Sequence, residues 1–462
     1  MKASRNGNPT HSGYVADVLC TDVLQLILEM FDPGKMDDRA TLQALSLVSH
    51  FFAARCQPLL FREIFLCDIR GTPHEPLSKG FTPIGKRCKV LMRLLTSRPH
   101  LIELIQRVKV GMSGGYEKGL GKIKEFQALL TMLFSQPGIR GPQAFHIVGE
   151  CFISNKNSFE KNVFYPFLAT RITALCIDAV WNLPMAVIAH CENLEDLTLI
   201  GKYAKLDEDS VSIPILINGG PKIKVLRHTG PTPVLQCLLT DPVTGQPFID
   251  LKSLKQYRPT FKSPSADIPL FATVCSIGAQ SLASIVLTVD LFNETLPDTQ
   301  GFDLLDFSHC WHVELMKLDL TISLVQPSDC LSRLHDVAAA LQTFPKCNDL
   351  RKLILQLHIH SAQYYPNFLK SSKVAWITLD AELKRISDHK PVSVEVLIKY
   401  STDVYHPSNE EMANELEGVF RNIISECLAL TRERQEGSFA LLFEFVNECY
   451  SHASYCRRWL HY

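Results

Sequence analysis

The first hydrophobic pattern along the chain, between residues 15 and 66, has the spacing of short helices. From Asp22 onward, apolar side chains recur at positions i, i+3, i+4 and i+7, which is one stripe of an amphipathic helix. The stripe consists of Leu24, Ile27, Leu28 and Phe31. Pro33-Gly34 follows directly and is a typical helix end. The pattern therefore predicts a helix of about ten residues here.

Two more helical clusters follow in the same segment. One runs from about Arg39 to Val48, and another begins at Phe51 and resumes after Pro58. We therefore predict three short helices and no strand in residues 15–66, preceded by a flexible tail at residues 1–14. Residues 67–105 are interpreted as a linker that contains one helix, because Pro and Gly are frequent there.

From about residue 106 the pattern changes to short runs of the form apolar-x-x-apolar-x-apolar. Clear runs begin at Ile172, Leu194, Leu282, Leu315 and Leu350, and looser ones at Ile223, Leu251 and Val394. Helical stretches are predicted between them at Pro184–Cys191, Pro269–Ser276, Cys330–Phe344 and Trp376–Ile386. Strands thus alternate with helices, which predicts an α/β fold.

One strand and one helix cannot enclose a core, but stacked units can. In a strand, alternate side chains share a face, so the last two apolar positions of each run point inward together. Stacking the units pairs the strands in parallel and covers them with helices. The runs start 22 to 44 residues apart. This range predicts an irregular α/β solenoid over residues 106–462.

The end of the chain is predicted to be helical. Ser408 and Glu411 form a capping-box pattern ahead of EEMANELEGVFRNIISECLAL, and a last helix is expected at Phe439–Cys449. These helices would cover the apolar end of the solenoid, because a terminal repeat otherwise exposes it.

The apolar runs resemble leucine-rich repeats. In that family the pattern continues to an Asn or Cys whose side chain satisfies loop backbone groups. Here the corresponding positions are Val180, Lys202, Asp290, Ser323 and His358. We therefore expect irregular loops rather than a regular asparagine ladder.

Residues 15–66 resemble an F-box. The resemblance lies in VLCTDVLQLILEMFD and LQALSLVSHFFAARCQPLLFREIFL, and its most specific part is S-L-V-S-x-x-F followed by P-L-L-F-R. The family's opening Leu-Pro is Leu19-Cys20 here, and its Trp near the end of the motif is Phe52. The full expectation is thus an F-box-like three-helix module followed by an irregular leucine-rich-repeat-like solenoid.

The resemblance implies a function without catalysis on this chain. F-box proteins are substrate receptors of cullin-RING (SCF-type) ubiquitin ligases: the F-box docks a Skp-type adaptor, and through it a cullin, while the repeats hold a protein substrate. We therefore expect no enzymatic activity and no cofactor. The residues at matching positions form the adaptor-facing or module-core set: Leu19, Leu24, Ile27, Leu28, Leu45, Val48 and Phe52.

Two alternatives remain open. The same apolar residues could pack onto the first repeat, which would make the chain a repeat scaffold without a ligase role. More remotely, GMSGG at residues 111–115 matches the Gly-x-Ser-x-Gly elbow of serine hydrolases, with Ser113 as nucleophile. No Asp and His partners are marked in order along the chain.

Other motifs lack the residues that their chemistry requires. GLGK at 119–122 has Tyr116 and Ile123 where a phosphate loop needs Gly and Ser or Thr. His309, Cys310 and His312 lie together, as do His358 and His360, but no further ligand stands at a metal-site spacing. We therefore predict no metal site.

The composition of the chain limits the kinds of partner and the cellular compartment that we expect. The 462 residues include 47 Lys and Arg and 48 Asp and Glu, a net charge of −1, which argues against a nucleic-acid partner. No apolar run approaches the roughly 18 residues of a membrane helix, so no membrane partner is expected. The N-terminus has no secretory pattern, and the 15 Cys contain no Cys-x-x-Cys pair. Reduced cysteines predict a cytoplasmic or nuclear protein.

Overall fold

The computed structural model describes most of the chain in separate segments. The described residues are 25–28, 30–31, 36–68, 84–112, 123–134, 141–149, 165–178, 188, 191–201, 220–230, 233–240, 245–262, 264–289, 304–324, 327–361, 373–402, 418–419, 421–422, 426–428 and 439–446.

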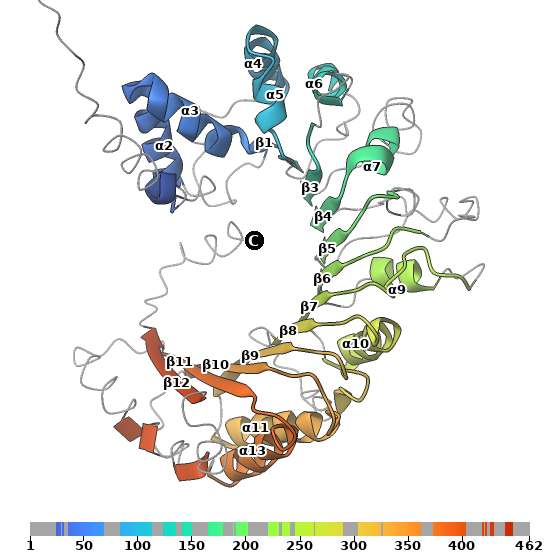
Figure 1. Ribbon diagram of the computed structural model, residues 1–462, viewed down its shortest axis with the longest axis vertical. Helices are drawn as coiled ribbons and strands as arrows, with labels where there is room; N and C mark the ends of the chain where they lie inside the picture. The colour runs from blue at the N-terminus through green and yellow to red at the C-terminus, as the bar shows by residue number, and fades with distance from the viewer. Residues whose placement is uncertain are drawn as a thin grey trace, which may run out of the picture.

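One parallel sheet of twelve strands runs through the described residues, and its strands follow one another in chain order. The sheet bends into an arc with the strands lining the inside and the helices outside (Figure 1). The strands are β1 (Glu63–Asp68), β2 (Arg107–Met112), β3 (Ala144–Gly149), β4 (Ala174–Asp178), β5 (Asp196–Ile200), β6 (Val225–Thr229), β7 (Gln256–Phe261), β8 (Ser284–Val289), β9 (Leu315–Leu324), β10 (Lys352–Ser361), β11 (Ser393–Thr402) and β12 (Phe439–Val446). The predicted α/β class and its parallel, solenoid-like stacking are confirmed.

The helices fall into two groups. Two of them, α2 (Met36–Val48) and α3 (His50–Phe61), precede the sheet and form a unit with the short helical stretch at residues 25–28. The others lie along the outside of the arc (Figure 1). They are α4 (Ile84–Ser97), α5 (Leu101–Leu104), α6 (Lys124–Phe134), α7 (Tyr165–Arg171), α9 (Pro233–Leu239), α10 (Pro264–Gly278), α11 (Pro327–Gln342) and α13 (Lys373–Ile386).

Strand alternation separates the core from the hollow of the arc. In β4 and β5 the buried side chains alternate with half-buried ones. The buried ones belong to a continuous apolar core that extends from Ile64 to Leu428. The half-buried ones face the hollow, because helices cover the other side.

Backbone hydrogen bonds join neighbouring units at the residue that precedes each of the strands β1 to β9. The carbonyl of Arg62 accepts hydrogen bonds from two consecutive amides of the next unit, Gln106 N–H and Arg107 N–H, each at 3.0 Å. The same double acceptance recurs at every strand from β2 to β9. The accepting carbonyls belong to Gln106, Gln143, Thr173, Glu195, Lys224, Lys255, Ala283 and Glu314. This junction fixes the register of each strand against the next.

The units between these junctions differ widely in length. Ala174 and Asp196, the first residues of β4 and β5, are 22 residues apart, whereas Glu63 and Arg107, which begin β1 and β2, are 44 apart. The irregular spacing predicted from the sequence is therefore a property of the fold.

One core position carries a histidine instead of an apolar side chain. His228 in β6 is buried, and its Nδ1 lies 3.1 Å from the Gly230 carbonyl while its Nε2 lies 2.8 Å from the Tyr257 hydroxyl. Burial lowers the pKa of His228 to about 4, so the ring is neutral near pH 7. Both ring nitrogens are satisfied, which lets a polar residue occupy the core.

Most of the predicted strands and helices are present. The runs at Ile172, Leu194, Ile223, Leu282, Leu350 and Val394 correspond to strands β4, β5, β6, β8, β10 and β11. Three predicted helices are α10, α11 and α13, and each starts three to five residues earlier than expected. Of the stretch Pro184–Cys191, only residues 188 and 191 are described.

Two strand runs were misplaced by a few residues. Leu315 begins β9 but is half-buried on the hollow side, while Val313, Met316 and Leu318 are buried and form the true run. Similarly, Leu254 rather than Leu251 takes the first position before β7. Both errors arose because apolar residues also occupy the neighbouring positions.

The N-terminal prediction was wrong in two respects. A strand, β1, begins at Glu63 inside the segment expected to be all helical, so the sheet starts far ahead of residue 106. Helix α3 also continues through Pro58 instead of restarting after it. Pro58 is exposed, so its ring projects away from the packed side and the helix loses one backbone hydrogen bond.

The C-terminal prediction was also partly wrong. Phe439–Val446 forms strand β12, paired in parallel with β11, instead of a last helix. Of the helix predicted after Ser408, residues 418–419, 421–422 and 426–427 are described and helical, and Cys427 and Leu428 are buried. The described part of that helix therefore packs on the core at Cys427 and Leu428, and strand β12 follows it in the chain.

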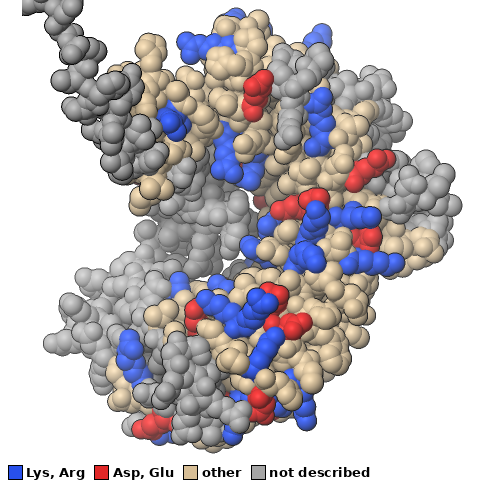
Figure 2. Space-filling view, in the orientation of Figure 1, with Lys and Arg blue, Asp and Glu red and all other residues tan. Residues whose placement is uncertain are grey.

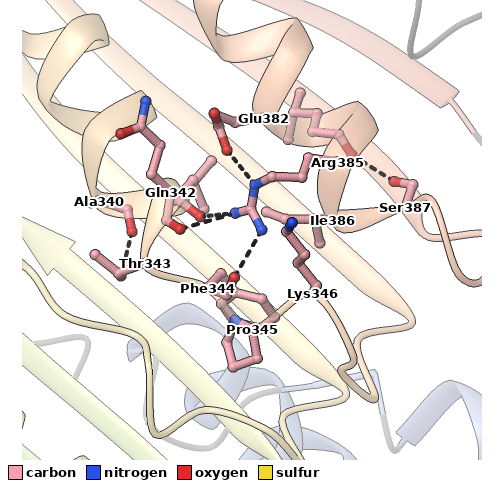
Figure 3. Close-up of polar contacts among 12 residues, drawn as sticks. Ala340, Gln342, Thr343, Phe344, Pro345, Lys346, Glu382, Arg385, Ile386 and Ser387 are labelled. Carbon is pink, nitrogen blue, oxygen red and sulfur yellow. Dashed lines mark hydrogen bonds and ion pairs between the residues drawn. The ribbon is translucent and has the colours of Figure 1, made fainter.

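Arg385 ties the ends of two outer helices together. From the last turn of α13, its guanidinium donates to the carbonyls of Leu341 (2.6 Å), Gln342 (3.3 Å) and Phe344 (3.0 Å) and pairs with Glu382 (2.6 Å) (Figure 3). These carbonyls stand at the C-terminus of α11, where helical partners are missing. One side chain thus caps α11 and fixes α13 beside it.

We expect Arg385→Ala to lower the free energy of unfolding by about 2 kcal/mol, because hydrogen bonds from a charged donor are lost. Urea unfolding measures the change. Arg351→Ala is the matched control: its side chain is 73% exposed and its ion pair with Glu314 spans 3.5 Å. Equal losses in the two variants would contradict the assigned role of Arg385.

Candidate partner-binding surfaces

The N-terminal helical unit has a very small core of its own. Among the described residues, Leu28, Leu42 and Cys56 are fully buried there. The partly buried side chains packed around them are Phe31, Leu45, Phe52, Leu59 and Leu60. A core of this size stabilises little by itself.

Several large apolar side chains of the same unit face solvent. Leu47 is 87% exposed, Met30 83% and Val48 68%. Leu26, Ile27 and Phe51 are also exposed. Exposed apolar side chains gathered in one small unit are typical of a surface that another protein covers.

The seven residues expected to face the adaptor divide by burial. Ile27 and Val48 are exposed and available to a partner. Leu28 is buried in the small core of the unit, and Leu45 and Phe52 pack against that core, so these three are core residues. Leu19 and Leu24 lie outside the described residues.

A groove of about 870 Å³ separates the helical unit from the first repeat. Its walls come from one side of α2, one side of α3, strand β1 and helix α4. Val48 lines it, and so do three arginines that the sequence did not mark as a group: Arg39, Arg87 and Arg98. Arg39 is 48 residues ahead of Arg87 in the chain, so no local spacing could have grouped it with Arg87 and Arg98.

The hollow of the arc holds a polar network on β9 and β10. Asp319 Oδ1 lies 3.0 Å from His358 Nε2, and Asp319 Oδ2 lies 3.5 Å from the Lys317 ammonium. Burial by itself raises the pKa of Asp319, but the hydrogen bonds and charges of His358 and Lys317 outweigh it and bring the pKa below the ordinary 3.8. Asp319 is therefore a carboxylate at neutral pH.

Gln356 completes this network. Its Nε2 is placed 2.5 Å from His358 Nε2. A ring nitrogen that donates to Asp319 cannot also accept from an amide N–H. Rotating the Gln356 amide by 180° puts its oxygen against His358 and satisfies both contacts. The amide N–H groups of Gln356 then point away from the histidine.

Other sequence candidates do not assemble into a reactive centre among the described residues. Cys310 is buried in the core, while His312 is exposed and pairs with Asp349 at 3.0 Å. Within the described part of the chain, no three His, Cys, Asp or Glu side chains are placed to hold a metal ion. Ser113 lies outside it. His358 stands where a leucine-rich repeat has its loop Asn or Cys, but here it lies within strand β10 rather than in a loop.

Comparison with known proteins gives no relative: no family model matches the chain, and neither curated proteins nor solved structures match it. Among the helices that are described, none has the length and apolar content needed to cross a bilayer.

We expect Asp319→Asn to remove part of the acid sensitivity of folding. A depressed pKa means that the carboxylate stabilises the folded state above pH 3.8 and loses this contribution as the pH falls through the lower, folded-state value. Urea unfolding between pH 7 and acid measures it, with Glu192→Gln as control, since Glu192 is an exposed carboxylate before β5. An unchanged pH profile in Asp319→Asn would contradict the pairing.

Proposed function

We propose that this chain is the substrate-receptor subunit of an SCF-type cullin-RING ubiquitin ligase. The F-box-like unit at residues 15–66 docks a Skp-type adaptor, which links it to a cullin. The leucine-rich-repeat-like solenoid holds a protein substrate. Ubiquitin transfer takes place on other subunits, so this chain supplies no catalytic residue.

The observation that carries this proposal is the apolar exposure of the N-terminal helices. Leu47, Met30 and Val48 are each more than two-thirds exposed, and the S-L-V-S-x-x-F motif includes two of them. Burying one such side chain contributes about 1.5–3 kcal/mol. Three or four of them at an interface can exceed an ordering cost of about 4 kcal/mol. The exposure therefore supports docking by this unit.

The inner side of the solenoid supports the role of a receptor. Half-buried charged and polar side chains from neighbouring strands stand side by side there, as in the pairs Lys352–Glu395 (2.7 Å) and His358–Asp319 (3.0 Å). A long array of polar side chains on a curved sheet offers many points of contact to a protein partner.

A repeat scaffold without a ligase role is the second candidate, and one observation favours it. Helix α3 leads into β1 through a single residue, Arg62, whose carbonyl accepts from Gln106 and Arg107. The helical unit is thus joined directly to the sheet, as an N-terminal cap would be.

The two candidates differ in adaptor binding. We expect the double variant Ile27→Asp, Val48→Asp to lose co-purification with the Skp-type adaptor, because two carboxylates would enter an apolar interface. The matched control is Ile377→Asp, Val374→Asp on α13, where the same residue types are 55% and 65% exposed. Retained binding by the first pair, or loss in both pairs, would contradict adaptor docking.

Truncation gives an independent comparison. Removing residues 15–61 deletes the helical unit but leaves β1 intact, whereas a cut at residue 66 would also remove most of that strand. The scaffold candidate predicts that this truncation lowers stability strongly and that the full chain does not bind the adaptor. The receptor candidate predicts that adaptor binding is lost while the solenoid stays folded by circular dichroism.

A further inference from the structure

The groove between the helical unit and the first repeat has an unusual charge. Three guanidinium groups line it, from Arg39 on α2, Arg87 on α4 and Arg98 just after α4. Arg39 and Arg87 are half-buried. In the part of the chain that the structure describes, none of the three side chains has a carboxylate partner. The one acidic residue that lines the groove, Glu63, is paired with Arg107 at 3.1 Å.

The arm around the groove, residues 36–68 and 84–112, also carries a net positive charge. Residues 36–68 and 84–112 contain ten Lys and Arg and five Asp and Glu, although the whole chain is almost neutral. On the face seen in Figure 2, the arm that contains α4 displays more basic than acidic side chains, whereas the middle of the arc mixes the two. The local field therefore favours an anionic partner.

The groove is apolar as well as basic. Leu47 and Val48 are largely exposed on one wall, and Phe65 of β1 is 38% exposed on another. A half-buried guanidinium group loses part of its hydration, and this loss costs free energy unless a carboxylate pairs with the group. A ligand that fits must therefore present apolar side chains and carboxylates together.

We propose that this groove binds an acidic, amphipathic segment of a partner protein. Its apolar side chains pack against Leu47 and Val48, and its carboxylates pair with Arg39, Arg87 and Arg98. A volume of about 870 Å³ suits a short segment rather than a whole domain. The exposed aliphatic side chains of Leu47 and Val48 favour the apolar side chains of a peptide. The aromatic wall residue Phe65 has the Lys109 ammonium 5.3 Å from its ring centroid, which leaves less of the ring for the stacking of a nucleotide base.

This inference goes beyond the proposed function and does not require it. The adaptor test changes Val48, which lines the groove, together with Ile27, which does not. The single variant Ile27→Asp therefore tests adaptor docking alone, and Arg87→Glu with Arg98→Glu tests the groove alone. If the ligase role is correct, the acidic segment belongs to the substrate or to a regulator of the receptor.

The test is selection from a phage-displayed library of random peptides of about twelve residues, which is about three helical turns. The full chain is immobilised in three forms: wild type, Arg87→Glu with Arg98→Glu, and Arg93→Glu. Arg93 is the matched control, because it is exposed on the same helix as Arg87 but does not line the groove. Circular dichroism checks that each form is folded, and fluorescence anisotropy then measures the affinity of the most enriched peptide.

We expect the wild type to enrich peptides rich in Glu, Asp and large apolar residues. Binding of the selected peptide should weaken about tenfold or more in the double variant, change less than about twofold in Arg93→Glu, and weaken as salt is raised. Failure to enrich acidic peptides, or equal binding by all three forms, would overturn the inference. Equally strong binding of a single-stranded oligonucleotide through Arg87 and Arg98 would also overturn it. So would displacement of the peptide by the adaptor, because the groove would then belong to the adaptor interface.

Discussion

The shape of this protein depends on one backbone interaction: just before each of the strands β1 to β9, one carbonyl accepts two consecutive N–H groups from the next unit. The residues that supply it include Arg62, Thr173 and Ala283, whose side chains have nothing in common. Because the junction uses only main-chain atoms, it does not restrict the sequence. Units of 22 residues, from Ala174 to Asp196, and of 44 residues, from Glu63 to Arg107, can therefore join the same sheet with their first strand residues paired.

The position of the groove follows from the same junction. The Arg62 carbonyl anchors the start of β1 against β2, and helix α3 ends at the residue before it. The helical unit is thus held at the edge of the first repeat, with α2 facing α4 across a gap. Apolar surface and unpaired arginines meet there because neither element alone has enough partners to cover them.

The sequence was informative wherever a unit alternated cleanly between apolar and polar positions, as in β4, β5 and β10. It was misleading where apolar residues were continuous. FALLFEFV in β12 has no clear period, so strand and helix could not be distinguished, and the extra leucine at position 315 shifted the run of β9. Arg39 could not be grouped with Arg87 and Arg98 from the sequence, because only the fold places α2 opposite α4 across the groove.

The stepwise order of the strands also has a mechanical consequence. Every strand pairs with its neighbours in the chain, from β1 with β2 to β11 with β12. A slight change of twist at each junction therefore adds up along the sheet, while every hydrogen bond is kept. The distance between the two ends of the arc therefore depends on the summed twist of all the junctions, which no single contact between the described residues of the two ends sets.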